Sequence, residues 1–287
     1  MTERKQQTRV AFLGPEGTFC EQAAHQYFAI AHFTPYNTIT DVFAAVEKNE
    51  VEYGVVPVEN STDGSVRETL DCFMQSKVRV CGEAEINVVH NLIVKPNTDI
   101  QQIQVVLSHP QALAQCRRYL ETMLGPIKLR ETSSTAQAVE LLNTVPNAAA
   151  IGTEAAAKQN QMSVVQRHIE DVANNVTRFF ILGKHDAKPT DHDKTSIVFS
   201  TKHIPGALYQ ILEVFAIRNI NLTKIESRPD RGQPWNYVFY LDFEGHRTEI
   251  KYKAALSEAR DRCEYLKVIG SYPKAAVTQS APPSKHG

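Results

Sequence analysis

Hydroxyl side chains stand at three places where the chain is expected to begin a helix. Thr18 precedes one helical pattern, Ser108 lies just before Pro110, and Ser133–Thr135 precede an alanine-rich stretch. The first N–H groups of a helix have no partner within the helix, so hydroxyls beside them can help to bind a carboxylate. Each hydroxyl can equally be an ordinary helix cap. The pattern therefore predicts an anion site, with capping as the alternative.

Amide and charged side chains follow two further apolar segments. Glu59 and Asn60 come directly after the segment that ends at Val58, and Arg178 lies in the run NNVTRF. Asn60 can donate to a carboxylate or a hydroxyl, and Arg178 can hold a carboxylate through two parallel hydrogen bonds. Because Glu59 would repel an anion, we expect it to be protonated or paired, for instance with Arg178. The alternatives are a capping turn and an ion pair within the fold.

Short apolar segments alternate with helical patterns through the first part of the chain. Thr18 and Glu21 form a Thr-x-x-Glu pair, which predicts a helix to about Ile30. We expect strands at 10–13, 53–58, 105–107, 148–151 and 179–182, and further helices over 66–74 and from Pro110. This alternation predicts α/β layers, in which ligands bind beyond the carboxyl ends of the strands. The candidate groups all lie at strand ends or helix starts, which predicts one shared site.

A different architecture follows the polar segment 185–194, which we interpret as a linker between domains 9–184 and 195–273. Strands are expected at 196–200, 222–227, 237–243 and 265–269, and helices from Pro205 and over 250–262. The resulting order βαββαβ is the ferredoxin-like pattern. Residues 274–287 are rich in Ala, Ser and Pro, and we expect them to be a disordered tail.

Composition excludes several classes of function. The 287 residues include 31 basic and 32 acidic side chains, so there is no cationic surplus to bind nucleic acid or an anionic membrane. No apolar run reaches the roughly 20 residues of a membrane span, and the N-terminus lacks an apolar secretory region. Five scattered cysteines predict reduced thiols in a cytoplasmic protein, without a metal role. P-loop, GxGxxG, HExxH and GxSxG motifs are absent, so we expect no cofactor.

The motifs together resemble those of prephenate dehydratases with a C-terminal ACT regulatory domain. The first domain has, in order, GPEGTF (14–19), PVENS (57–61), SHPQALAQC (108–116), TSSTAQA (132–138) and NNVTRF (174–179), and the second has GALYQIL (206–212) and ESRP (226–229). The resemblance implies a two-lobed, periplasmic-binding-protein-like catalytic domain and a ferredoxin-like ACT domain. It also implies conversion of prephenate to phenylpyruvate, L-phenylalanine as an effector bound between subunits, and a homodimer or homotetramer.

The resemblance implies a role for each motif. Thr177 is the first candidate to assist the leaving hydroxyl, as a hydrogen-bond donor that strengthens while negative charge develops. The other catalytic candidates are Glu59, Asn60, Ser108 and Gln115, and the substrate-binding candidates are Thr18, Ser133, Ser134, Thr135, Arg178 and Phe179. The candidates for the effector site are Gly206, Ala207, Leu208, Glu226, Ser227 and Arg228. The alternative for that last group is a subunit interface without a ligand.

Two other functions remain open at this point. An arogenate dehydratase would act on the amino analogue of prephenate, and no residue of the sequence decides between the two substrates. A non-catalytic amino-acid sensor would use the same kind of fold without turnover. The missing signal sequence argues against a periplasmic solute carrier, and the complete NNVTRF motif argues for catalysis.

Overall fold

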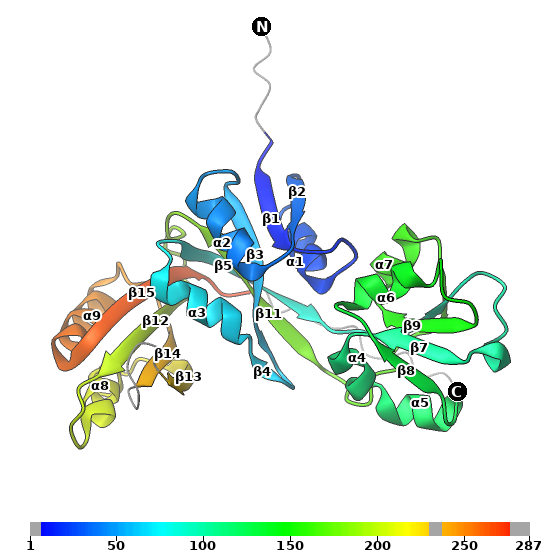
Figure 1. Ribbon diagram of the computed structural model, residues 1–287. Coiled ribbons are helices and arrows are strands. Elements are labelled where there is room, and N and C mark those ends of the chain that lie inside the picture. Colours follow the sequence, from blue (N-terminus) through cyan, green and yellow to red (C-terminus); the bar gives the residue numbers. More distant parts are fainter. Residues whose placement is uncertain (1–6, 230–236, 276–287) are drawn as a thin grey trace, which may run out of the picture. The chain divides into compact units, whose positions relative to one another are not determined.

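The computed structural model describes residues 7–229 and 237–275 (Figure 1). Contacts divide the chain into two compact units, of which the first contains the described residues up to Val42 together with 55–66 and 86–179. The second contains 43–54, 67–85 and the described residues from Phe180 on. This division does not follow the linear boundaries predicted from the sequence, because the chain passes between the units several times.

One sheet has the strand order β2-β1-β3-β11-β5, and the short strand β4 pairs with β3. Its strands are β1 (Arg9–Leu13), β2 (His32–Tyr36), β3 (Tyr53–Asn60), β4 (Gly64–Ser65), β5 (Arg79–Asn87) and β11 (Val176–Gly183). The helices α1 (Phe19–Tyr27), α2 (Ile39–Glu47) and α3 (Arg67–Gln75) alternate with these strands. Most residues of β1 and β3 are buried, as expected for strands covered on both faces.

A second sheet, with the order β10-β6-β9-β7-β8, lies in the first unit. It consists of β6 (Asn91–Val94), β7 (Val105–Ser108), β8 (Lys128–Glu131), β9 (Ala148–Gly152) and β10 (Ser163–Gln166). The helices here are α4 (Pro110–Gln115), α5 (Arg117–Met123), α6 (Thr135–Leu141) and α7 (Glu154–Gln159), with a 3-10 turn at Ile100–Gln102. Alternate residues of β9 enter two separate hydrophobic clusters, so both faces of the sheet are covered.

The expected helix from Pro110 is broken at Cys116 into α4 and α5. The carboxylate of Asp171 accepts hydrogen bonds from the backbone N–H groups of Arg118 (2.9 Å) and Tyr119 (3.2 Å), which caps α5 as a new helix. The Asp171 N–H in turn donates to the Gln115 carbonyl at 2.7 Å. Gln115 therefore stands at the end of a short, separately fixed helix.

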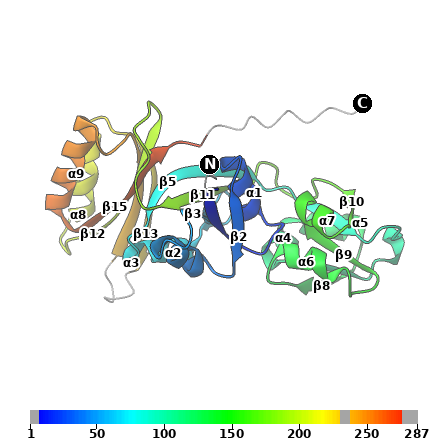
Figure 2. The same ribbon diagram turned by 90° about the horizontal axis from the view of Figure 1, so that it is seen from above.

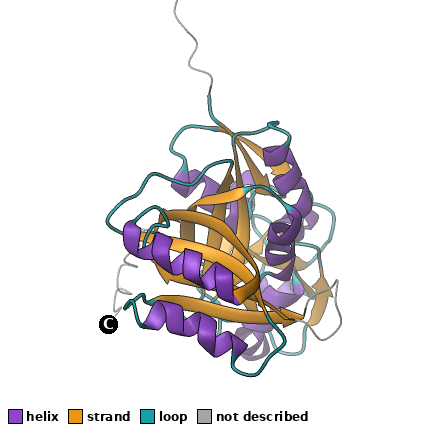
Figure 3. Ribbon diagram, turned by 90° about the vertical axis from the view of Figure 1, so that its left-hand side faces the viewer, coloured by secondary structure: helices purple, strands orange, loops and turns teal. Residues whose placement is uncertain are grey.

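The C-terminal module has the predicted order βαββαβ. Its elements are β12 (Asp193–Thr201), α8 (Ala207–Ala216), β13 (Leu222–Pro229), β14 (Tyr237–Glu244), α9 (Ile250–Arg262) and β15 (Cys263–Pro273). The sheet order is β13-β14-β12-β15, and both helices lie on the same face of this sheet (Figures 2 and 3). Phe199, Phe215 and Phe243 are fully buried between the two layers. The ferredoxin-like prediction is confirmed.

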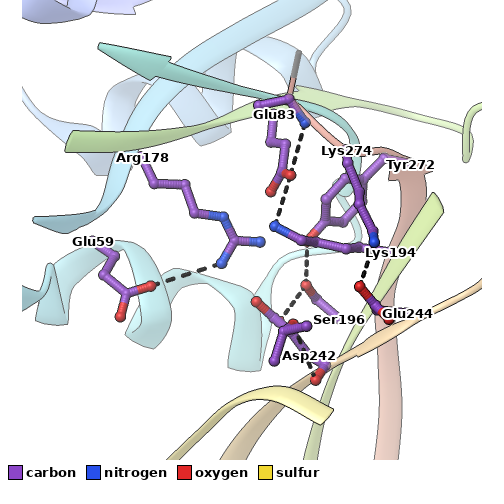
Figure 4. Close-up of polar contacts among 11 residues, drawn as sticks. Glu59, Glu83, Arg178, Lys194, Ser196, Asp242, Glu244, Tyr272 and Lys274 are labelled. Atoms are coloured by element: carbon purple, nitrogen blue, oxygen red, sulfur yellow. Dashed lines mark hydrogen bonds and ion pairs between the residues drawn. The ribbon is translucent and has the colours of Figure 1, made fainter. Parts of the chain in front are cut away.

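A buried polar network in the second unit pairs two carboxylates, Glu83 and Asp242, with groups that are distant in the sequence. Lys194 Nζ lies 2.9 Å from Glu83 Oε1, and the Ser196 hydroxyl donates to Asp242 Oδ1 at 2.6 Å (Figure 4). The Tyr272 hydroxyl lies 2.5 Å from the same Ser196 oxygen. Because buried polar groups are destabilising when unpaired, this network explains how Glu83 and Asp242 are tolerated inside the fold.

The segments between and after the domains differ in part from the prediction. Strand β12 already begins at Asp193, inside the expected linker. Lys274 and Ala275, assigned to the tail, donate backbone hydrogen bonds to the His192 carbonyl (2.8 Å) and Glu83 Oε1 (2.9 Å). The remaining tail prediction, 276–287, lies outside the described residues. In the described part of the chain, no helix is both long and apolar enough to span a membrane.

Candidate active site

The first unit contains a cavity of about 330 Å³. Its described lining comprises Leu13, Gly14, Thr18, Phe19, Cys20, Asn37, Pro57, Asn60, Val88, His90, His109, Gln111, Ala112, Gln115, Ser133, Ser134, Thr135, Thr177 and Phe179. These residues come mainly from strand ends and helix starts, as the α/β pattern predicts. None of them is a lysine, arginine, aspartate or glutamate. An anionic ligand in this cavity would therefore be bound by neutral donors and helix dipoles.

The strand period decides which motif residues reach the cavity. Thr177 and Phe179 of β11 line it, whereas Arg178 between them does not. Successive side chains of a strand point to opposite faces, so Arg178 faces away from its two neighbours. Its guanidinium lies 3.7 Å from Glu59 Oε2, and its side chain is only 11% exposed (Figure 4). Glu59 is thus paired, as expected, but the pair stands outside the cavity lining.

Ser108 has a structural position. It is fully buried, and its hydroxyl donates to the Ile151 carbonyl at 2.8 Å, which links β7 to β9. The predicted capping of the Pro110 helix by Ser108 is wrong, because His109 is the N-cap residue. His109 Nδ1 accepts a hydrogen bond from the Gln111 N–H at 3.3 Å. His109 and Gln111 line the cavity in the place expected for Ser108.

The amide side chains beside Thr177 determine the direction of the hydrogen bond between Asn60 and Thr177. The backbone N–H groups of Thr62 and Asp63 donate to Asn60 Oδ1 at 2.9 and 3.1 Å, so that the other side of the Asn60 amide must be the NH₂ group. This NH₂ group donates to the Thr177 hydroxyl oxygen at 2.8 Å and to Asn175 Oδ1 at 2.7 Å. The Thr177 oxygen is therefore an acceptor in this bond, and its proton is left for another group.

The same chain continues to Gln115. Asn175 Nδ2 donates to Gln115 Oε1 at 3.2 Å, and Gln115 Nε2 donates to Asp63 Oδ2 at 2.8 Å. The Asp63 carboxylate also accepts from Gln111 Nε2. Since the ionised carboxylate only accepts, the orientation of the Gln115 amide is determined. Gln115 Oε1 also lies 2.8 Å from His90 Nε2.

The hydroxyls at the helix starts serve as caps and line the cavity at the same time. Thr18 Oγ1 accepts from the Glu21 N–H at 3.4 Å, and Glu21 Oε2 accepts from the Gly17 N–H at 2.6 Å. This pair confirms the predicted start of α1, although the helix ends at Tyr27 rather than Ile30. At α6, Ser134 Oγ accepts from the Gln137 N–H at 3.0 Å.

Ser133 donates from its hydroxyl to Gln137 Oε1 at 2.8 Å, and Thr135 is the first residue of α6. Of the catalytic and substrate-binding candidates, the structure brings eight to one cavity, namely Thr18, Asn60, Gln115, Ser133, Ser134, Thr135, Thr177 and Phe179. Glu59, Ser108 and Arg178 are not among its lining residues. Their proposed catalytic and binding roles stay predictions.

Six polar residues of the cavity wall or of its hydrogen-bond chain were not predicted: Asn37, Asp63, His90, His109, Gln111 and Asn175. Asn175 belongs to the NNVTRF motif, so a signal for it existed in the sequence. His90 lies in the connection between β5 and β6, and Asp63 lies in the β3–β4 turn. Neither stands in a local pattern that predicts a ligand site, and both are recruited by contacts with Gln115.

The candidate effector residues lie in the second unit, on two elements. Gly206 caps α8 with φ of 77°, a left-handed conformation that favours glycine, and no atom lies within 4 Å of where a Cβ would stand. Ala207 and Leu208 form the first turn of this helix. Glu226, Ser227 and Arg228 lie within β13 rather than after it. Arg228 Nη1 lies 2.8 Å from Asp71 Oδ1 and also donates to the Arg67 carbonyl at 3.0 Å. The geometry therefore gives Arg228 two partners within the protein, and its role in binding an effector stays a prediction.

An α/β unit whose strand ends and helix starts enclose a cavity with apolar, hydroxyl and amide groups and no charged side chain has the features of a small-molecule site. Residues 10–187 match the family model described as prephenate dehydratase, and residues 195–257 match the model of the ACT domain. The chain therefore belongs to the prephenate dehydratase family, with an ACT domain at its C-terminal end. The expected fold class and the resemblance of the motifs are confirmed.

Three similar proteins illustrate this relationship. The bifunctional chorismate mutase/prephenate dehydratase of Aquifex aeolicus is 46% identical over 94% of this chain and 75% of its own length. A solved structure of prephenate dehydratase in complex with L-Phe from Arthrobacter aurescens is 32% identical, with a TM-score of 0.87 over 93% of this chain and 90% of that chain. A structure described as GqqA, a novel type of quorum quenching acylases, is 28% identical, with a TM-score of 0.85 over 95% and 100%.

Proposed function

We propose that this protein is a prephenate dehydratase that converts prephenate to phenylpyruvate, carbon dioxide and water in the cavity of the first unit. The observation that carries the proposal is the bond from Asn60 Nδ2 to the Thr177 oxygen, which leaves the Thr177 proton for the substrate. Family membership and the eight motif residues that share the cavity support the same assignment.

The reaction requires a hydrogen-bond donor for the departing hydroxyl and a site that solvates the departing carboxylate weakly. The ring carboxylate leaves as carbon dioxide, the electrons of the broken C–C bond enter the ring, and the C–O bond breaks to release hydroxide. The hydroxide then takes a proton from the solvent to become water. Aromatisation of the ring drives both departures. Thr177 donates to the departing oxygen as charge develops, and one such donor typically contributes about 100- to 1,000-fold in rate.

The neutral lining of the cavity suits the loss of the carboxylate. A carboxylate held by a cation would be stabilised in the ground state, which raises the barrier to its departure. Here the described lining offers hydroxyl and amide donors and the start of the nine-residue helix α1 at Thr18. These groups orient the dianion without neutralising it.

L-Phenylalanine is the proposed effector of the ACT domain, and the relative crystallised with L-Phe supports this choice. The N–H groups at the start of α8, after Gly206, suit the effector carboxylate, although that of Ala207 already donates to the Ile204 carbonyl at 3.3 Å. We further propose that the protein is a cytoplasmic homodimer or homotetramer assembled through its ACT domains. Regulation requires that phenylalanine favour one conformation by about 1–3 kcal/mol.

The acylase described for one structural relative finds little support in this cavity. Acyl transfer needs an activated nucleophile, usually a hydroxyl or thiol beside a base. Cys20 lines the cavity, but burial raises the pKa of its thiol to about 12, which opposes thiolate formation. The hydroxyls of Thr18, Ser134 and Thr177 are bonded to backbone or amide groups rather than to a histidine.

Turnover of the purified protein with prephenate, and separately with arogenate, tests the proposal. We expect phenylpyruvate from prephenate, and a changed rate when L-phenylalanine is added. Faster turnover of arogenate would support the same decarboxylative dehydration with arogenate, rather than prephenate, as the preferred substrate. Binding of phenylalanine without turnover of either substrate would contradict the enzymatic proposal and favour the amino-acid sensor.

A further inference from the structure

His90 has a buried ring in the wall of the cavity. The residue is only 2% exposed and lies between β5 and β6. Its backbone N–H donates to Glu170 Oε2 at 2.9 Å, and its ring meets the edge of Phe19 with 6.2 Å between ring centres. Nε2 lies 2.8 Å from Gln115 Oε1. Three sides of His90 are thus held by protein groups.

The amide chain determines which nitrogen of His90 carries the proton. Gln115 donates through Nε2 to the Asp63 carboxylate, so its Oε1 faces His90 and can only accept. His90 Nε2 must therefore be the protonated nitrogen. Burial lowers the pKa of the imidazole below the usual 6.5, against the opposing effects of the Gln115 hydrogen bond and the nearby Glu170, which favours the neutral ring. Nδ1 consequently presents a lone pair.

His90 Nδ1 is exceptional within the described part of the chain. It is the single buried side-chain nitrogen or oxygen there that has no hydrogen-bond partner. A buried acceptor without a donor is destabilising, and such groups in native proteins commonly have a functional partner. The wall of the cavity thus includes one residue with an unused donor proton, Thr177, and one with an unused acceptor, His90, whose Nδ1 is shielded from solvent in the ligand-free protein.

We propose that His90 Nδ1 accepts a hydrogen bond from the ring hydroxyl of the substrate and so distinguishes the substrate from the product. This inference rests on the proposed function. The carboxylates and the keto group of prephenate are acceptors, and the ring hydroxyl is its sole donor. Thr177 donates a hydrogen bond to the oxygen of that hydroxyl, and the hydroxyl donates a hydrogen bond to His90 Nδ1. The proton stays on the hydroxyl and is not transferred to the imidazole.

The consequence is selective release of the product. Phenylpyruvate lacks the ring hydroxyl, so in its complex His90 Nδ1 has no partner. Sites that hydrogen-bond a substrate hydroxyl reject the analogue without it, because a buried polar group is then left unpaired. The bond forms with the ground-state substrate and loosens as the hydroxyl departs, so its loss should affect KM more than kcat.

The variants His90→Gln and His90→Asn separate the two ring nitrogens. Glutamine can place its amide where Nε2 stands and keep a donor for Gln115, whereas asparagine can place its amide oxygen where Nδ1 stands. With His90→Gln we expect KM for prephenate to rise on the order of 10- to 100-fold. The inhibition constant of phenylpyruvate should stay within about threefold of wild type. His90→Asn should retain more of the preference for prephenate over phenylpyruvate than His90→Gln does.

Equal weakening of the binding of prephenate and phenylpyruvate would overturn the inference and leave His90 as a support for Gln115. A larger loss of the preference for prephenate in His90→Asn than in His90→Gln would do the same.

NMR of ¹⁵N-histidine-labelled Thr177→Val enzyme keeps His90 unchanged and needs no folded His90 variant. The Nδ1 resonance should move from a free to a hydrogen-bonded value with prephenate but not with phenylpyruvate. The same shift with both ligands, or none with prephenate, would contradict it. Absence of wild-type turnover would instead refute the proposed function.

Discussion

Asn60 and Thr177 are joined by a hydrogen bond whose direction is set by the backbone. The Asn60 amide nitrogen lies 2.8 Å from the Thr177 oxygen, and the Asn60 amide oxygen is occupied by two backbone N–H groups. Thr177 must therefore accept from Asn60, and its own proton is available for the ligand. The geometry turns a poorly acidic hydroxyl into an oriented donor without a neighbouring base.

Asn60→Asp should reverse this arrangement with almost no change in volume. The introduced carboxylate oxygen accepts, so the Thr177 proton is drawn away from the substrate. We expect kcat with prephenate to fall on the order of 100-fold, as for the loss of one oriented donor. The matched control is Asn143→Asp in the exposed turn after α6, where kcat should stay near wild type. Nearly normal turnover of Asn60→Asp would show that the direction of the bond is unimportant.

The pair formed by Glu59 and Arg178 should contribute to stability more than to chemistry. It lies outside the cavity lining, with 3.7 Å between the charged groups. We expect Glu59→Gln to lower the free energy of unfolding by on the order of 1 kcal/mol while kcat stays within about tenfold of wild type. Urea denaturation and steady-state kinetics measure the two quantities. A loss of more than 100-fold in kcat with unchanged stability would instead make Glu59 a catalytic group.

Arg228 of the ESRP motif should act through Asp71 on helix α3 rather than on the effector. Asp71→Asn removes the charged partner of Arg228 and leaves β13 itself unchanged. We expect phenylalanine to bind Asp71→Asn with near wild-type affinity but to change turnover less, since a mutation that touches neither ligand can modulate coupling by about 0.5–2 kcal/mol. Calorimetry with phenylalanine, beside assays with and without it, gives both values.

Arg228→Gln is the companion variant in that experiment. If the contact transmits the signal, Arg228→Gln and Asp71→Asn should weaken the response to the same degree. Complete loss of phenylalanine binding in Arg228→Gln, with an unaffected Asp71→Asn variant, would show that Arg228 holds the effector directly.

Glu47 links stability to pH in the second unit. Its carboxylate accepts from the Ser76 hydroxyl at 2.5 Å and from the Lys77 N–H at 2.7 Å, and these bonds lower its pKa below the usual 4.5. A lowered folded-state pKa stabilises the fold above pH 4.5, and this stabilisation is lost as the pH falls through the lowered value. Glu47→Gln should therefore be less stable than wild type at pH 7, and the difference should shrink in acid below pH 4.5.

Urea denaturation of wild type and Glu47→Gln at several pH values measures this difference. Ser76→Ala serves as the second variant, because it removes the largest cause of the lowered pKa. A gap between wild type and Glu47→Gln that is equally large at pH 7 and well below the lowered pKa would refute the linkage.

Local patterns predicted the strands and helices whose signals are complete in the sequence. Helix α9 has the expected bounds, Ile250–Arg262, and Thr18 caps α1 as its Thr-x-x-Glu spacing indicates. The break at Cys116 was not predictable, because it depends on the carboxylate of the distant Asp171. The strands β2, β4, β5, β6, β8 and β10 and the helices α2 and α7 were not predicted from these patterns.

The site was predictable at the level of motifs but not of side-chain direction. A period of two along β11 already separates Arg178 from Thr177 and Phe179, so this part of the signal was present in the sequence. The positions of His90 and Asp63 were not, because each joins the site through side chains that are distant in the sequence, Gln115 among them. Tertiary contacts of this kind leave no local trace.

The turnover number of Thr177→Val with prephenate, set beside that of Thr177→Ser, tests the central claim most directly. Valine keeps the shape of threonine and removes the hydroxyl, whereas serine keeps the hydroxyl and loses a methyl group. We expect kcat to fall about 100- to 1,000-fold in Thr177→Val, and far less in Thr177→Ser. Both variants should fold, with Thr177→Val less stable by on the order of 1 kcal/mol because the Asn60 amide loses an acceptor. Turnover by Thr177→Val within a few-fold of wild type would contradict the assignment of Thr177 as the donor to the departing hydroxyl.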